Sequence, residues 1–130
     1  MKYLIIILSL ILLILAYNSN FFKSGFKFEN YTGTGKNTKL TEVLRRDHPV
    51  GSDGIKLKEK LEKAGAKCWL VPKKDFSLQA KSAKANYVWM CNYTTGLINI
   101  NPLHHYNVWL FLGEDRRVIF LGSSIEKGIY

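Results

Sequence analysis

The sequence predicts an α+β domain in which two N-terminal helices pack on a three- to four-stranded antiparallel sheet, preceded by a hydrophobic N-terminal segment. Three observations support this prediction. An uncharged apolar run begins the chain, two amphipathic stretches follow it, and several runs of aromatic and β-branched residues come last. The chain has 130 residues and is 47% hydrophobic, which is enough for one buried core after the leader is set aside.

The apolar run extends from Tyr3 to Tyr17, contains one polar residue, Ser9, and carries no charge. Behind Met1–Lys2, such a run is typical of a secretory signal peptide or an uncleaved N-terminal membrane anchor. The polar residues after Ala16 make a poor cleavage site, which favours the anchor, although the run is shorter than the roughly 20 residues that span a bilayer comfortably. We therefore expect a signal or anchor at residues 1–20 and a domain in the periplasm or elsewhere outside the cytoplasm.

A linker is expected at residues 21–37, between the apolar run and the α+β domain at residues 38–130. This segment contains three glycines and two threonines, with Phe22, Phe26 and Phe28 spread among lysines. The phenylalanines suit a membrane interface or packing on the domain, and the sequence does not choose between these two positions.

The first helix is expected from Thr38 to His48, because Leu40, Val43 and Leu44 fall on one face at helical spacing. Asn37 or Thr38 is the expected cap. Proline at position 49 disfavours helical geometry at the preceding residue, so the helix should end there.

The second helix should begin at Ser52 as its cap and carry Leu57, Leu61 and Ala64 on its apolar face. Gly65 stands where a left-handed C-cap belongs, so we expect the helix to end just before it. The lysines of this helix should face outward.

Strands are expected where short runs are rich in aromatic and β-branched residues. These runs lie at 67–71, 86–93, 106–112 and 117–121, with an ambiguous short run at 97–100 and a polar loop at 73–84. The runs at 106–112 and 117–121 flank Gly113–Arg116, which predicts a hairpin. The run at 106–112 is apolar on both faces, as expected of a central strand.

Cys68 and Cys91 are the only cysteines, and both lie in predicted strands. Outside the cytoplasm two cysteines commonly pair, so we predict a disulfide worth about 3 kcal/mol for a loop of this length. The alternatives are two buried free thiols, or a reactive thiol in a small cysteine-dependent enzyme that uses Cys68 or Cys91 with His105.

The net charge of +9 is concentrated in nine lysines between Lys56 and Lys84. Such a stretch forms a solvated face, or binds an anionic membrane or nucleic acid. An export signal disfavours nucleic acid, and the stretch lacks the arginines and interleaved aromatic residues that stack on bases. The predicted contact surface, for an envelope protein or an anionic membrane surface, is formed by Lys56, Lys60, Lys63 and Lys67.

No motif in the sequence indicates a reaction, a cofactor or a metal site. The adjacent His104 and His105 point to opposite sides of an extended chain, so they do not readily chelate a metal together. Thr32–Lys36 lacks the spacing of a phosphate-binding loop. We therefore expect a non-catalytic protein that has no catalytic residues, cofactor, metal or small-molecule substrate.

The helix opening at Pro49–Ser52, the residues Leu57, Leu61 and Ala64–Ala66, and the segment Val108–Val118 resemble small bacterial envelope domains of the SmpA/OmlA (BamE-like) type. The resemblance extends from about Lys39 to Leu121. It implies two helices followed by a three-stranded antiparallel sheet, in a bacterial envelope. This chain differs from the pattern in lacking a lipobox cysteine and in carrying its own two cysteines.

Overall fold

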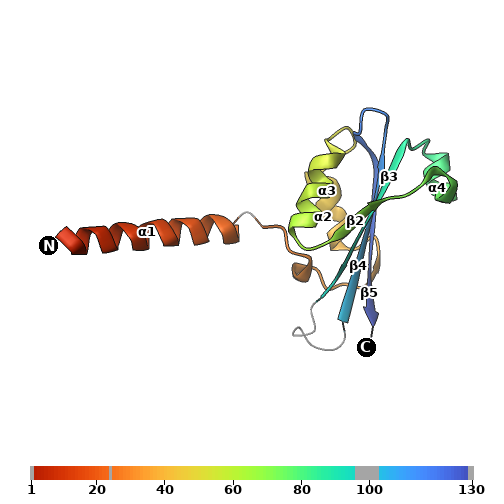
Figure 1. Ribbon diagram of the computed structural model, residues 1–130. Coiled ribbons are helices and arrows are strands. Elements are labelled where there is room, and N and C mark those ends of the chain that lie inside the picture. Colours follow the sequence, from red (N-terminus) through yellow and green to blue (C-terminus); the bar gives the residue numbers. More distant parts are fainter. Residues whose placement is uncertain (1, 24, 96–102, 129–130) are drawn as a thin grey trace.

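The computed structural model describes residues 2–23, 25–95 and 103–128, and it contains one apolar helix followed by an α+β domain (Figure 1). The sheet is antiparallel and has five strands in the order β1-β5-β4-β3-β2. The α+β class is therefore confirmed, whereas the prediction of three to four strands is too low. The strand at 106–112 belongs to β4, the central strand of the sheet, as predicted.

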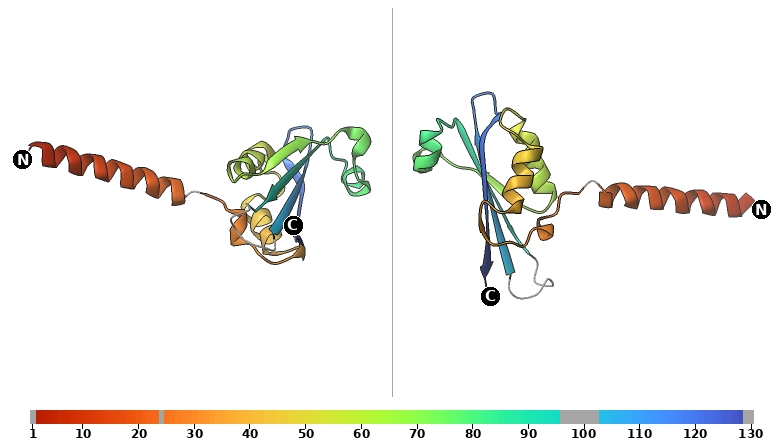
Figure 2. Two further views of the ribbon diagram at one scale, coloured as in Figure 1. Left: turned by 60° about the horizontal axis from the view of Figure 1, so that its bottom comes forward. Right: turned by 180° about the vertical axis from the view of Figure 1, so that it is seen from behind.

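Two longer helices, α2 and α3, cover one face of the sheet, and the short helix α4 lies on the other face (Figures 1 and 2). The elements are α1 (Lys2–Lys23), η1 (Phe28–Asn30), β1 (Gly35–Lys36), α2 (Lys39–Asp47), α3 (Gly54–Lys63), β2 (Lys67–Leu70), η2 (Lys73–Asp75), α4 (Leu78–Ser82), β3 (Tyr87–Thr94), β4 (Leu103–Leu112) and β5 (Val118–Gly128). The predicted loop at 73–84 is wrong in detail, because it holds η2 and α4. The ambiguous run at 97–100 lies outside the described residues.

Helix α1 extends past residue 20 and projects from the domain in each view (Figures 1 and 2). Its described large apolar side chains, from Tyr3 to Ile14, are 47–81% exposed. Since these residues are nearly consecutive, apolar side chains surround this part of the helix on every side. Within the described residues, no helix meets the combined length and hydropathy of a membrane-spanning helix.

Helix α2 begins and ends close to where the sequence predicts. Thr38 occupies the N-cap position, and the His48 amide closes the last turn by donating to the carbonyl of Leu44 at 2.8 Å. The next residue, Pro49, is followed by a turn in which the Ser52 hydroxyl donates to the Pro49 carbonyl at 2.6 Å. The ring of Pro49 therefore ends the helix as expected.

The N-cap of α3 is Asp53, so the prediction of Ser52 is wrong by one residue. The Asp53 carboxylate accepts from the amides of Ile55 at 2.9 Å and Lys56 at 3.2 Å. A carboxylate at this position accepts hydrogen bonds from two of the free amides of the first turn. Its negative charge also interacts favourably with the positive end of the helix dipole. At the other end, Gly65 has a φ of +106°, the left-handed geometry expected of a C-cap glycine.

The core lies between the sheet and the pair α2 and α3. Helix α2 packs on β5, and α3 packs on β3 and β2. The residues that meet there include Leu40, Leu44, Leu57, Leu61, Val108, Leu110, Leu112 and Ile125. The predicted hairpin is confirmed, because β4 and β5 are joined by a turn in which the Gly113 amide donates to the Arg117 carbonyl at 3.0 Å.

The segment before the helices also contributes to this core. Phe28 is 1% exposed and stacks on Tyr93, with the ring centroids 4.7 Å apart. The Tyr106 hydroxyl donates to the Tyr31 carbonyl at 2.7 Å, and β1 pairs with the outer edge of β5. Residues 25–36 are therefore held on the domain by both side-chain packing and backbone pairing.

Candidate functional site

Cys68 and Cys91 form a disulfide between β2 and β3, as predicted. They lie directly opposite one another in the ladder, and their Cα atoms are 4.0 Å apart. The Val71 amide donates to the Val88 carbonyl, three positions along the same ladder, so the alternation of an antiparallel pair makes Cys68 and Cys91 a non-hydrogen-bonded pair. Side chains approach most closely at such positions, which suits a cross-strand disulfide.

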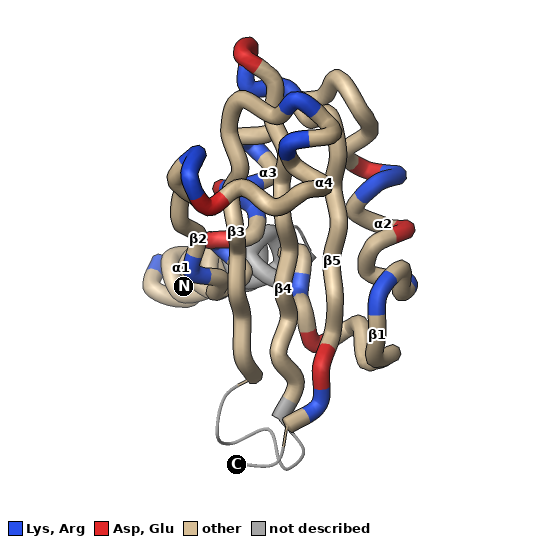
Figure 3. Tube along the Cα trace, turned by 90° about the vertical axis from the view of Figure 1, so that its right-hand side faces the viewer, with Lys and Arg blue, Asp and Glu red and all other residues tan. Residues whose placement is uncertain are grey.

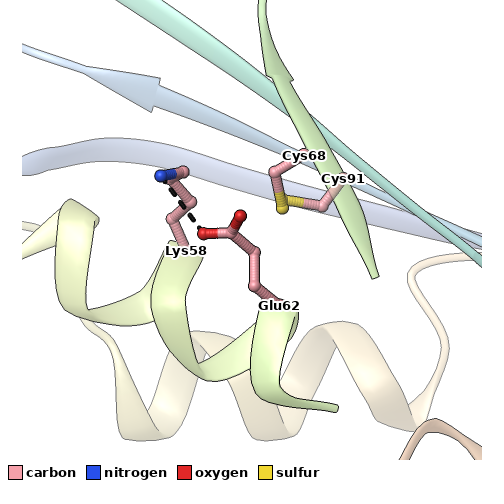
Figure 4. Close-up of a disulfide and its surroundings, with 4 residues drawn as sticks. All are labelled: Lys58, Glu62, Cys68 and Cys91. Atoms are coloured by element: carbon pink, nitrogen blue, oxygen red, sulfur yellow. Dashed lines mark ion pairs between the residues drawn. A yellow bond between two sulfur atoms is a disulfide. The ribbon is translucent and has the colours of Figure 1, made fainter. Parts of the chain in front are cut away.

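One side of α3 covers this disulfide (Figure 4). The Lys58 ammonium forms an ion pair with Glu62 at 3.1 Å and lies 4.4 Å from the centre of the Trp89 ring on β3. The disulfide and these contacts together attach the edge strand β2 and helix α3 to β3.

The other side of α3 forms a groove with the segment that follows α1. This groove, called the α3 groove below, has a volume of about 1110 Å³. It is lined by Gly25, Phe26, Lys27, Glu29 and Asn30 from the segment and by Lys56, Glu59, Lys60, Lys63 and Ala64 from α3 or its end.

Three of the four lysines of the predicted contact surface line this groove, because Lys56, Lys60 and Lys63 follow helical spacing along one side of α3. Lys67 does not line it. It precedes Cys68 on β2 and pairs with Asn92, so alternation along the strand places it on the face opposite the disulfide.

The charge of the α3 groove is positive, with four lysines against Glu29 and Glu59. Glu29 is engaged by a hydrogen bond that the Tyr93 hydroxyl donates. Burial, followed by this contact with Glu29, raises the pKa of Tyr93 to about 12. Tyr93 therefore keeps its proton at neutral pH and remains a donor to the carboxylate.

Lys60 contacts both walls of the groove and the end of α2. Its ammonium lies 5.5 Å from the centre of the Phe26 ring and 3.2 Å from Nε2 of His48, the residue that ends α2. Burial first, and the Lys60 charge second, lower the pKa of His48 below its usual 6.5, although the carboxylate of Asp47 acts in the opposite direction. At neutral pH a neutral His48 can accept a hydrogen bond from Lys60.

We expect folding stability to fall as the pH drops below about 6.5, in part because of His48. Its folded pKa is lowered, so the unfolded chain binds the proton more readily, and the stability present above the unfolded pKa is lost on acidification. Thermal unfolding at about pH 7.5 and about pH 5.5 measures this loss. His48→Gln should show a smaller loss over the same range, and an equal loss in both proteins would contradict this role of His48.

His105 lies away from both cysteines. It pairs with Thr94, whose hydroxyl is 3.0 Å from its Nδ1, whereas Cys91 pairs with Val108, three residues further along β4. Odd and even positions of β4 face opposite sides, so His105 and the disulfide lie on opposite faces of the sheet. The cysteine-dependent enzyme also needs a reduced thiol, and it stays an untested alternative.

Residues 25–30 contribute one side of the groove, which the sequence did not predict. The available signal was the alternation of phenylalanine and lysine in this segment, which left open whether the rings pack on the domain. Among the described residues, no group of three or more His, Cys, Asp or Glu side chains gathers in a way that could hold a metal ion.

Comparisons with family models, with curated proteins and with solved structures found no match to this chain. The resemblance to SmpA/OmlA domains accordingly stays a prediction.

Proposed function

We propose that this chain is a membrane-anchored, non-catalytic binding module of a bacterial envelope, with its domain outside the cytoplasm. In this proposal α1 is the anchor, and the α3 groove is the surface that contacts an envelope protein or an anionic lipid. The observation that carries the proposal is the exposure of apolar side chains on every side of α1 between Tyr3 and Ile14. A helix that is apolar all round needs an apolar environment, and an exposed patch of this kind marks a membrane or a partner.

The disulfide between Cys68 and Cys91 supports placement of the domain outside the cytoplasm. Disulfides persist in oxidising compartments such as the periplasm and are rare in the reducing cytosol. The predicted resemblance to SmpA/OmlA domains agrees with an envelope location.

Fractionation of a bacterial host that expresses the full chain tests the anchor. We expect the protein in the membrane pellet after alkaline carbonate extraction, which removes peripheral proteins. The variant Ile7→Lys/Ile11→Lys places two charges on one side of α1 and should move to the soluble fraction, because a charge in an apolar membrane environment is costly.

The matched control is Val50→Lys/Leu78→Lys, which replaces two exposed apolar residues of the domain and should stay in the pellet. Recovery of the unmodified chain in the soluble fraction would overturn the proposal. Equal behaviour of the α1 variant and the control would also overturn it.

A further inference from the structure

The geometry points to an anionic phospholipid headgroup as the ligand of the α3 groove. This inference rests on the proposed function and deepens it, because it names one partner for the same surface. In this arrangement a lipid that lies beside α1 places its phosphate among the lysines of α3.

The groove lies close to the end of α1 along the chain. Gly25 lines the groove and lies only two residues after Lys23, the last residue of α1. Two extended residues span at most about 7 Å. The rim of the groove therefore stays close to the end of α1 in any orientation of the domain, and an anchored α1 keeps it near the headgroups.

The positive charge of the groove complements the negative charge of a phosphate. Lys56, Lys60 and Lys63 follow one another along one side of α3, and the seven-residue interval from first to last corresponds to about 10 Å of helix. Their ammonium groups can surround one phosphate, for which lysine is a common ligand as a point charge. Of the two carboxylates in the groove, Glu29 already accepts from Tyr93.

The lining of the groove also has an apolar part. Phe26 and Ala64 lie among the lysines. The Phe26 ring is fixed from two sides, since it packs edge-on against Phe28 with centroids 5.0 Å apart and stacks on Tyr31 at 5.8 Å. Lysine side chains add apolar stems below their charges. A surface that is apolar below and cationic above suits a phospholipid better than a free anion.

Thermal unfolding of the full chain in dodecyl maltoside micelles tests this inference. Dioctanoyl phosphatidylglycerol is titrated into the micelles, with dioctanoyl phosphatidylcholine and inorganic phosphate as parallel arms. A ligand that binds only the folded state raises the unfolding midpoint. We expect a rise with phosphatidylglycerol and a much smaller one with either other compound, and we expect native mass spectrometry to show phosphatidylglycerol retained on the protein.

The variant Lys56→Gln/Lys60→Gln/Lys63→Gln should bind phosphatidylglycerol at least about tenfold more weakly. The lysine ammonium groups would lie closer to the phosphate than the Debye length, so salt screens their attraction only slightly. The matched control is Lys73→Gln/Lys74→Gln/Lys81→Gln, which removes the same charge from exposed lysines of η2 and α4 and should bind normally. Lys56→Gln/Lys63→Gln keeps the contacts of Lys60 with His48 and Phe26, so it separates loss of binding from loss of folding.

Three results would overturn the inference. Equal shifts with phosphatidylglycerol and phosphatidylcholine would show no headgroup recognition, and an equal shift with inorganic phosphate would assign the groove to a free anion. Equal weakening in the groove variant and the control would show a diffuse charge effect. A chain that stays in the membrane pellet but gives any of these results leaves the proposed anchor intact and removes only the assignment of the groove to a phospholipid headgroup.

Discussion

Replacing Phe28 with alanine should lower the free energy of unfolding by about 3–5 kcal/mol, the usual cost of truncating a fully buried phenylalanine. The ring is 1% exposed and contacts Tyr93 on β3 and Tyr106 on β4. Its loss would leave a cavity between the sheet and the segment that leads out of α1. Urea unfolding of the full chain in detergent, followed by tryptophan fluorescence, measures the change.

Leu78→Ala is the control for this prediction, because Leu78 is exposed and its truncation should change stability by no more than about 0.5 kcal/mol. If Phe28→Ala cost no more than this control, residues 25–31 would behave as a linker that does not pack on the domain. The α3 groove would then lose one of its two walls.

Replacing both cysteines with alanine should lower the free energy of unfolding by about 3 kcal/mol, since the disulfide closes a loop with a sequence separation of 23. The effect should concentrate on β2. This strand has four residues, and in the described part of the chain it lies at the edge of the sheet and pairs with β3. Hydrogen exchange should therefore speed up most at Lys67–Leu70 in the Cys68→Ala/Cys91→Ala variant.

Urea unfolding under reducing conditions also measures how much the disulfide contributes to the free energy of unfolding. The reduced wild type should approach the stability of the double variant. A double variant as stable as the oxidised wild type would contradict the structural role of the disulfide, and the alternative of a cysteine used in catalysis would gain weight.

Local sequence signals predicted the elements that depend on one or a few residues. Pro49 ended α2, Gly65 ended α3 and the turn after Gly113 joined β4 to β5. Each of these signals is a constraint on backbone geometry that acts within a few residues. The N-cap of α3 was misplaced by one residue because Ser52 and Asp53 are both good caps, and the choice depends on how the chain leaves Pro49.

Elements that depend on distant partners could not be predicted in the same way. Strand β1 has two residues and exists only through its pairing with Ile125 and Ser124 on β5. Helix α4 has five residues, of which only Ala80 is buried. The helix lies on the face of the sheet opposite α2 and α3 (Figure 3). Neither segment is long enough for its hydrophobic pattern to identify it.

The candidate site could be predicted only in part, because one of its walls follows from local spacing and the other from tertiary contacts. The lysines of α3 share one side through helical spacing, which the sequence displays directly. Lys67 separates from them because the chain turns at Gly65 and continues as a strand. The opposite wall comes from residues 25–30, and its place depends on the burial of Phe28, a tertiary contact that no local pattern encodes.

One mass measurement tests the membrane anchor and the oxidising compartment together. The intact mass of the protein from the membrane fraction is measured with and without thiol alkylation after denaturation. We expect a chain that retains α1 and takes up no alkylating agent, because the anchored domain holds its cysteines in the Cys68–Cys91 disulfide. A chain shortened by loss of α1, with two alkylated thiols, would contradict both the anchor and the oxidising compartment.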